Sequence, residues 1–179
     1  MQFNLSLFVI VIAFATVFAA SSVTNLANTI TVIDNKVGNL EELLQAFPNT
    51  GGTLEQAIAL HNSVHDVLKA IDNTKTAVDV IDHVVSITDS EEIINRFRDL
   101  ESVIQSALRA LGDKKNSICS IGIGRVSAVI QLDIQQLLDA VVGVTESLLA
   151  KCAADCTARG RAVSINIQEI LTTGIKLFA

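Results

Sequence analysis

The chain of 179 residues predicts an all-α fold: a five-helix antiparallel bundle of long amphipathic helices. Apolar residues recur at alternating spacings of three and four along almost the whole chain, as on one face of a helix. Short clusters of glycine, proline and polar residues interrupt this pattern. No segment alternates apolar and polar residues with the period of two that a half-buried strand requires.

The first twenty residues carry no charged side chain and contain four of the seven phenylalanines. An apolar run that ends in small residues before a polar segment is typical of a secretory signal peptide. We therefore predict a signal peptide over 1–20 and a single helical domain over 21–179. An uncleaved signal anchor is the alternative, because no lysine or arginine precedes the run. The run is short for a bilayer span and no second one follows, so no transmembrane segment is predicted.

The first helix of the mature domain is predicted from Val23 to Phe47, where every apolar residue of one stripe follows the last by three or four positions. The breaker cluster at 48–52, which contains a proline and two glycines, ends it. Thr53 is predicted to cap the second helix, because Gln56 lies three residues later and completes a capping box.

The second helix is predicted to end near Thr88. Thr88 and Glu91 form another capping box, which starts the third helix. That helix is predicted to end at Gly112, and residues 113–124 are predicted to form a loop.

The fourth helix is predicted over 126–148, where the stripe again alternates spacings of four and three. A short connection around 153–155 leads to a fifth helix, with its stripe over 163–178. Several of these helices span about 40 to 50 Å at 1.5 Å per residue. An antiparallel bundle is the simplest arrangement that buries all five stripes together.

Composition excludes several classes of function. The chain has 13 basic and 19 acidic residues, a net charge of -6 and no basic cluster, so it lacks the positive surface that nucleic acid requires. Beyond the predicted signal peptide only Phe47, Phe97 and Phe178 are aromatic. The interior is therefore aliphatic, and stacking on bases or sugars is not expected.

The three cysteines predict one disulfide if the protein is secreted. Cys119 precedes the fourth helix and Cys152 follows it, so a helix of roughly 40 Å separates them, whereas bridged cysteines have Cα atoms within about 7 Å. Cys152 and Cys156 are therefore the candidate pair. Cys119 is expected to be buried, free or used for dimerisation.

His61 and His65 are four residues apart and share one helix face, a spacing that is found in metal sites. The pattern supplies no further ligand, so no metal is predicted; the histidines border the stripe, or His61 bonds a ligand carboxylate inside the bundle. No phosphate loop or nucleophile elbow is found. We therefore predict no catalytic residue, no cofactor and no enzymatic activity.

Five segments carry a resemblance to a known family: 43–48, 51–54, 57–62, the lysine pair at 114–115, and 129–138. In this order the chain resembles the fungal hydrophobic surface binding protein A family, also called antigenic cell-wall galactomannoproteins. The resemblance implies a secreted all-helical domain whose members bind hydrophobic surfaces or hold fatty acids in an apolar tunnel. It also implies, for some members, recruitment of lipolytic enzymes to such surfaces.

Taken together, the sequence predicts a secreted, non-enzymatic protein that binds long-chain fatty acids or hydrophobic surfaces. The alternative is a structural or antigenic cell-wall mannoprotein, or an adhesive protein that recruits secreted hydrolases. Burial of an acyl chain would supply about 0.8 kcal/mol per CH₂, less the ordering costs. The candidate lining residues come from the second and fourth helices, with His61 at the head group: Ile58, Leu68, Ile71, Ile130, Ile134, Leu137 and Val141.

Overall fold

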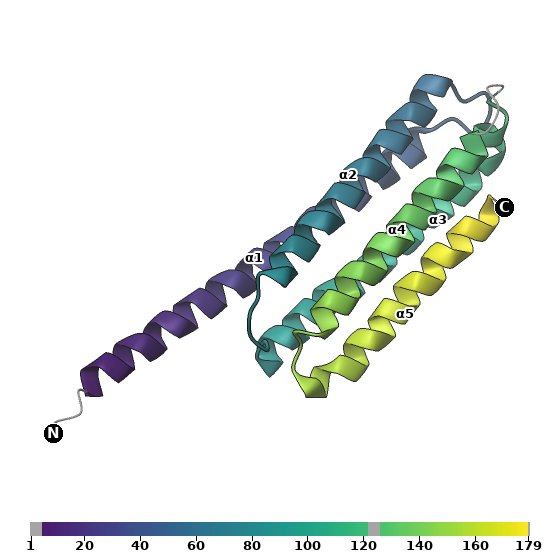
Figure 1. The fold of residues 1–179 in the computed structure, drawn as a ribbon. Helices are drawn as coiled ribbons and strands as arrows, with labels where there is room; N and C mark the ends of the chain where they lie inside the picture. Colours follow the sequence, from purple (N-terminus) through teal and green to yellow (C-terminus); the bar gives the residue numbers. More distant parts are fainter. Residues whose placement is uncertain (1–4, 122–125, 179) are drawn as a thin grey trace.

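The computed structural model describes residues 5–121 and 126–178, with side chains from residue 23 onward in those ranges. It confirms the predicted all-α fold, because the described residues form five helices and no strand (Figure 1). The helices are α1 (Leu5–Ala46), α2 (Leu54–Asp79), α3 (Ile87–Cys119), α4 (Val126–Leu149) and α5 (Ala154–Leu177).

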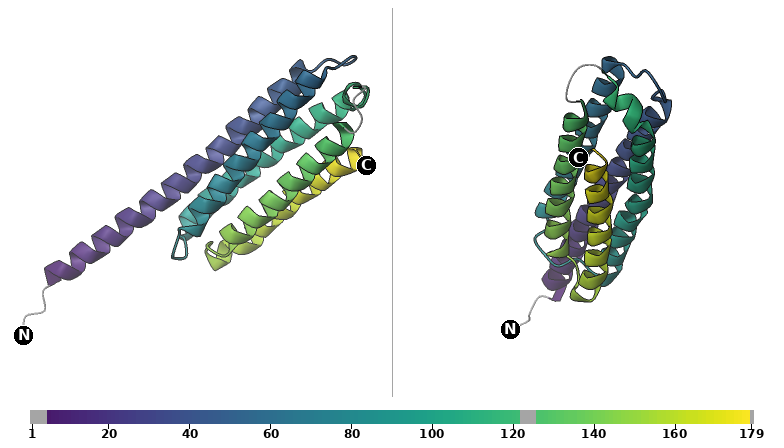
Figure 2. Two further views of the ribbon diagram at one scale, coloured as in Figure 1. Left: turned by 45° about the horizontal axis from the view of Figure 1, so that its top comes forward. Right: turned by 90° about the vertical axis from the view of Figure 1, so that its right-hand side faces the viewer.

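The five helices close into a ring in the order α1, α2, α4, α5, α3, and each packs on its two neighbours in that ring. Successive helices in the chain run in opposite directions along a common axis (Figures 1 and 2). A ring of five cannot alternate direction throughout, so α2 runs parallel to α4, and α3 runs parallel to α1 and α5. No helix occupies the axis, which side chains from all five apolar stripes must therefore fill.

The connection between α1 and α2 is set by local chemistry. Thr53 accepts a hydrogen bond from the Gln56 N–H (3.3 Å), and the Gln56 side chain accepts one from the Thr53 N–H (3.0 Å). This confirms the predicted capping box. Gly51 has a φ of 72°, a left-handed conformation that glycine adopts without strain. The predicted breaker cluster therefore turns the chain where expected.

The predicted boundary between the second and third helices is wrong. α2 ends at Asp79, and Ser86 caps α3 instead of Thr88, accepting a hydrogen bond from the Asp89 N–H (3.1 Å). The intervening run is rich in β-branched residues, which favour a helix weakly. The Val85 N–H donates to the Lys151 carbonyl (2.8 Å), so this run is fixed against the α4–α5 turn.

The predicted end of the third helix at Gly112 is also wrong, because α3 continues to Cys119. A glycine inside a helix costs only about 1 kcal/mol. Ile118 is fully buried, and its burial in the core offsets a penalty of that size. The first part of the predicted 113–124 loop is thus helical, and its residues 122–124 lie outside the described part of the chain.

α4 is the described helix that is long and apolar enough to cross a membrane by length and composition alone. In the structure it forms one wall of the ring, packed on α2 and α5. Ile134, Val141, Val144 and Leu148 are buried there. α4 is therefore a wall helix whose inner face is buried in the bundle.

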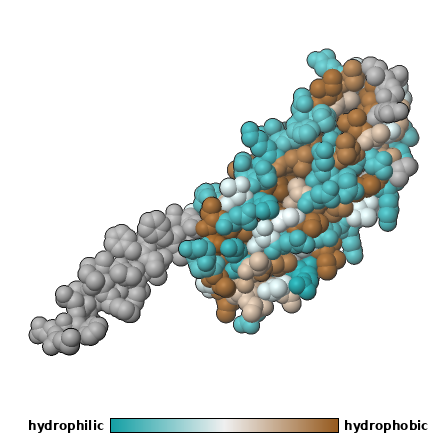
Figure 3. All heavy atoms as spheres, in the orientation of Figure 1, coloured by the Kyte–Doolittle hydropathy of each residue, from teal (hydrophilic) through white to brown (hydrophobic). Residues whose placement is uncertain are grey.

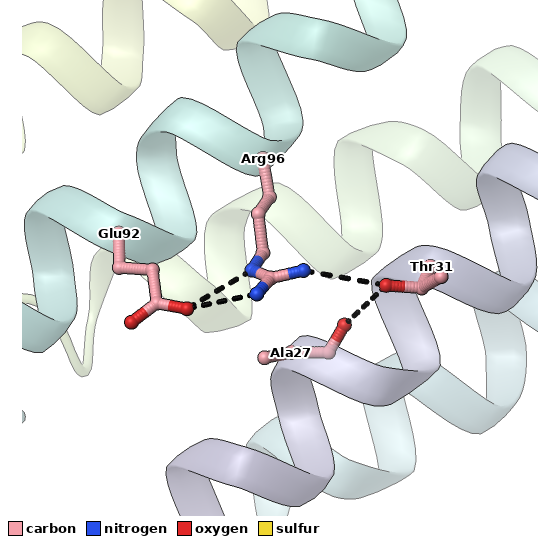
Figure 4. Close-up of polar contacts among 4 residues, drawn as sticks. All are labelled: Ala27, Thr31, Glu92 and Arg96. Atoms are coloured by element: carbon pink, nitrogen blue, oxygen red, sulfur yellow. Dashed lines mark hydrogen bonds and ion pairs between the residues drawn. The ribbon is translucent and has the colours of Figure 1, made fainter.

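A polar cluster joins α1 to α3 on the outside of the ring. Arg96 forms an ion pair with Glu92 on the same helix (2.9 Å) and donates to Thr31 Oγ1 on α1 (3.3 Å), and Thr31 in turn donates to the Ala27 carbonyl (3.1 Å) (Figure 4). Exposed contacts of this kind contribute less than about 1 kcal/mol each. Most of the stability must therefore come from the aliphatic interior.

The three cysteines carry free thiols in the structure. Cys119 is exposed, which excludes the expectation that it is buried. The buried Cys156 thiol donates to the Ile87 carbonyl (3.8 Å), and Cys152 is buried as well. The predicted bridge between Cys152 and Cys156 is not formed here, and their pairing stays a prediction. Burial raises the pKa of the Cys152 thiol, which keeps it protonated and unreactive.

We expect one thiol per folded chain to react rapidly with a disulfide reagent such as DTNB, and three after denaturation. The fast thiol is Cys119, so Cys119→Ser should abolish the reaction of the folded protein. If Cys152 and Cys156 are bridged in the secreted protein, the denatured chain should show one reactive thiol without reductant. Rapid reaction of two or more thiols in the folded chain would contradict the burial of this pair.

Candidate ligand-binding cavity

A cavity lies on the axis of the ring, and all five helices contribute to its wall. It has a volume of about 60 Å³, and no polar atom lines it. Val37 of α1, Ile71 of α2, Phe97 of α3, Val141 of α4 and Leu171 of α5 are among its lining residues. We call it the axial cavity. It follows directly from the ring, because five inward stripes meet there with no central helix between them.

A second cavity of about 50 Å³ continues along the same axis between α1, α2, α3 and α4. We call it the edge cavity, because its lining includes two polar residues, His61 and Asp133. The residues that line both cavities are Leu40, Ala107, Leu108 and Leu137. The two cavities therefore adjoin at these side chains, and we call the pair the channel.

The channel is long but narrow. On α3 it is lined from Phe97 to Leu111, which corresponds to about 21 Å at 1.5 Å per residue. Ligand sites have volumes of about 300 to 1,000 Å³, so an acyl chain would need the side chains on the axis to move apart. At about 24 cal/mol per Å³, cavities of this size cost the fold about 1 kcal/mol each. Filling them with apolar atoms would recover that energy.

The structure places six of the eight predicted lining residues in these walls. The axial cavity is lined by Ile71, Leu137 and Val141, and the edge cavity by His61, Ile130, Ile134 and Leu137.

The structure places the other two predicted lining residues, Ile58 and Leu68, outside both cavity walls. Ile58 is 48% exposed, and the half-buried Leu68 lines neither cavity. The buried stripe of α2 passes through the neighbouring Ala57, Leu60 and Val67 instead. The prediction places the larger Ile58 on the inner face of α2. Its small neighbour Ala57 occupies that face instead.

Sequence reasoning missed the contributions of α1, α3 and α5. Val37, Phe97 and Leu171 belong to apolar stripes that the spacing predicts, but spacing does not show which stripe positions meet at one level of the axis. That depends on the order of helices in the ring.

A polar cluster closes the edge cavity between α2 and α4. His61 Nδ1 lies 2.8 Å from Asp133 Oδ2, and the His65 ring lies edge-on to the His61 ring with centroids 4.5 Å apart. The Asp133 side chain is 3% exposed and that of His61 37% exposed. Asp133 is a missed functional residue, found only when α2 and α4 are known to be neighbours. One feature of the sequence could have pointed to Asp133: it is an acidic residue beside the apolar stripe of α4, the most apolar described helix after α1.

This cluster changes the predicted role of His61. The imidazole is already bonded to Asp133, so a ligand carboxylate that reaches His61 also approaches a buried carboxylate. Like charges at short range in a poorly solvated site repel strongly. His61 alone is thus an unfavourable partner for the head group of a fatty acid.

Solved structures similar to this one are fungal. Ligand binding domain 1 of the Penicillium marneffei MP1 protein, complexed with arachidonic acids, has a TM-score of 0.79 at 18% identity, with 88% of this chain and 99% of that chain covered. AFMP4P in complex with palmitic acid has a TM-score of 0.78 at 20% identity, covering 90% and 99%. Domain 2 of MP1, complexed with multiple arachidonic acids, scores 0.77 at 17% identity, covering 87% and 95%. At these identities the likeness shows a shared fold.

No curated protein matches the chain. The family model for hydrophobic surface binding protein A matches residues 23–150, from the first described side chain of α1 to the end of α4. This match covers well over half of the chain, and the chain therefore belongs to the hydrophobic surface binding protein A family.

Proposed function

We propose that this protein binds a long-chain fatty acid along the axis of its helix ring and that it acts by binding, without catalysis. The observation that carries the proposal is the apolar channel, to which every helix contributes. Its length of about 21 Å suits an extended long-chain acyl group. Proteins of the same fold were solved with palmitic or arachidonic acid bound, which supports the same ligand class here.

The energetics favour a flexible apolar guest. Each CH₂ group moved from water into the channel contributes about 0.8 kcal/mol, which must exceed the cost of ordering the chain and widening the ring. The side chains that must move are mostly aliphatic, such as Leu40, Leu108 and Leu137 between the two cavities. Such side chains change rotamer without exposing buried polar groups.

The proposal is tested on one purified sample by mass spectrometry of extracted lipid and by displacement of a fluorescent fatty acid. We expect co-purifying long-chain acids and saturable binding of palmitate at micromolar protein. Octanoate has half the carbons and should bind about a hundredfold more weakly or worse, because less apolar surface is buried. The absence of both bound lipid and saturable displacement would overturn the proposal.

Adsorption to hydrophobic surfaces is a second candidate function, favoured by large apolar side chains that lie outside the ring. Val80, Val84 and Ile87 around the α2–α3 connection are 67%, 66% and 52% exposed. Apolar side chains also reach the visible face between polar ones (Figure 3). A protein working in this way adsorbs to hydrophobic resin without saturable ligand binding. We place both functions outside the cell, after export by the predicted signal peptide over 1–20; attachment to a cell wall and recruitment of lipolytic enzymes belong to the second candidate.

A further inference from the structure

We propose that His61, His65 and Asp133 bind a divalent transition-metal ion such as Zn²⁺ at the edge cavity, and that this ion holds the carboxylate of the bound fatty acid. Only the second part, in which the ion holds the fatty-acid carboxylate, rests on the proposed function. The three residues come from two neighbouring helices, α2 and α4. Two neutral imidazoles and one carboxylate form a donor set that suits zinc and related ions.

The three side chains bring their ligand atoms near one another. One ligand atom from each residue can be chosen so that all three lie within 4.8 Å of one another. Ligand atoms bound at about 2.0 Å to a tetrahedral ion lie roughly 3.3 Å apart. The separation of 2.8 Å between His61 and Asp133 is slightly shorter than this, so a small opening of that pair admits the ion. His65 is exposed and can adjust without disturbing the core.

The location leaves room for a ligand on the ion. His61 and Asp133 line the edge cavity, while His65 is exposed and does not line it. The His61 side chain is also 37% exposed, so the cluster lies between the apolar channel and water. Three protein ligands leave at least one coordination position for another group. A carboxylate at the end of the channel can occupy that position.

Charge gives the ion a function in the proposed binding. Without it, the cluster presents the Asp133 carboxylate to the head group, and the two negative charges repel. A divalent cation gives the ion and Asp133 together a net positive charge, which attracts the head group. It also gives the almost fully buried Asp133 carboxylate a charged partner in addition to His61. The ion therefore removes the repulsion that makes His61 alone a poor head-group contact.

The first test measures the metal alone. The chain is purified without a histidine tag, stripped with a chelator and titrated with zinc chloride near neutral pH, by calorimetry and by competition with a chromogenic chelator. We expect one zinc ion per chain. His65→Ala should weaken zinc binding at least tenfold, and Asp133→Asn, which keeps the side-chain shape, should do the same. Circular dichroism checks that each variant is folded.

His83→Ala is the matched control, because His83 is the remaining histidine and is paired with Asp82 outside this cluster (2.9 Å). It should leave zinc binding unchanged. Failure of the wild-type chain to bind zinc overturns the proposal, and so does an equal loss in His83→Ala and His65→Ala.

The second test compares palmitate with palmityl alcohol, which has the same chain without a carboxylate. We expect zinc to tighten palmitate binding at least fivefold and to leave the affinity for the alcohol unchanged. Because coupling between two ligands is reciprocal, palmitate should tighten zinc binding by the same factor. Equal palmitate affinity with and without zinc overturns the head-group role. Binding of palmityl alcohol in the absence of zinc measures the channel alone. If the alcohol does not bind, the proposed function is wrong, and the zinc titration still tests the metal site.

Discussion

Replacing Phe97 by alanine is expected to lower the free energy of unfolding by about 3 to 5 kcal/mol. Phe97 is 4% exposed and points from α3 to the axis, where it lines the axial cavity. Truncation removes a buried ring and enlarges an existing cavity, and the rigid helices around it can collapse only in part. At about 2 to 4 °C per kcal/mol for a chain of this size, the midpoint of thermal unfolding should fall by roughly 10 °C.

Chemical and thermal denaturation, followed by circular dichroism, measure this change. The control is Leu132→Ala on α4, which also truncates a large residue in a helix but at a position that is 56% exposed. It should change stability by no more than about 0.5 kcal/mol. A loss below about 1 kcal/mol in Phe97→Ala, far under the range for a buried ring, would show that the axis is not packed as described.

The local sequence pattern predicts the helices well where the apolar stripe and the capping residues indicate the same bounds. The predicted end of the fourth helix differs by one residue from the observed Leu149, and the described part of this helix begins at Val126, directly after residues that lie outside the description. The errors occur where a tertiary contact overrides local preference. α2 ends early, at Asp79, and in the connection after it the Val85 N–H donates to the Lys151 carbonyl. Spacing along the apolar stripe cannot reveal this contact. Likewise, only the burial of Ile118 explains why α3 continues beyond Gly112.

The candidate site is predictable only in part, for a related reason. Spacing identifies an inner face for each helix, so residues such as Ile71 and Ile134 are found from sequence. The cluster of His61 and Asp133 joins residues 72 positions apart, and only the ring order places α2 beside α4. Pairings of this kind follow from topology, which a single sequence with five similar stripes does not specify.

Replacing Ala107 by leucine is expected to weaken palmitate binding at least tenfold while the chain stays folded. Ala107 is 5% exposed on α3 and lines both cavities. Leucine adds three carbon atoms at the junction, so it occupies the space that an acyl chain must cross. Each cavity costs the fold about 1 kcal/mol, so filling this space should leave the stability of the free protein unchanged or raise it by up to about 1 kcal/mol.

The variant is informative because it is expected to weaken binding without lowering stability. A general disturbance of the fold would lower stability and binding together, whereas a blocked channel lowers binding alone. Ala128→Leu adds the same atoms at an exposed position of α4 and should change neither property. Palmitate titration and denaturation of the three proteins give both quantities. If Ala107→Leu binds palmitate like the wild type and is equally stable, the acid does not use the axis of the ring, and binding must be assigned to the outer surface.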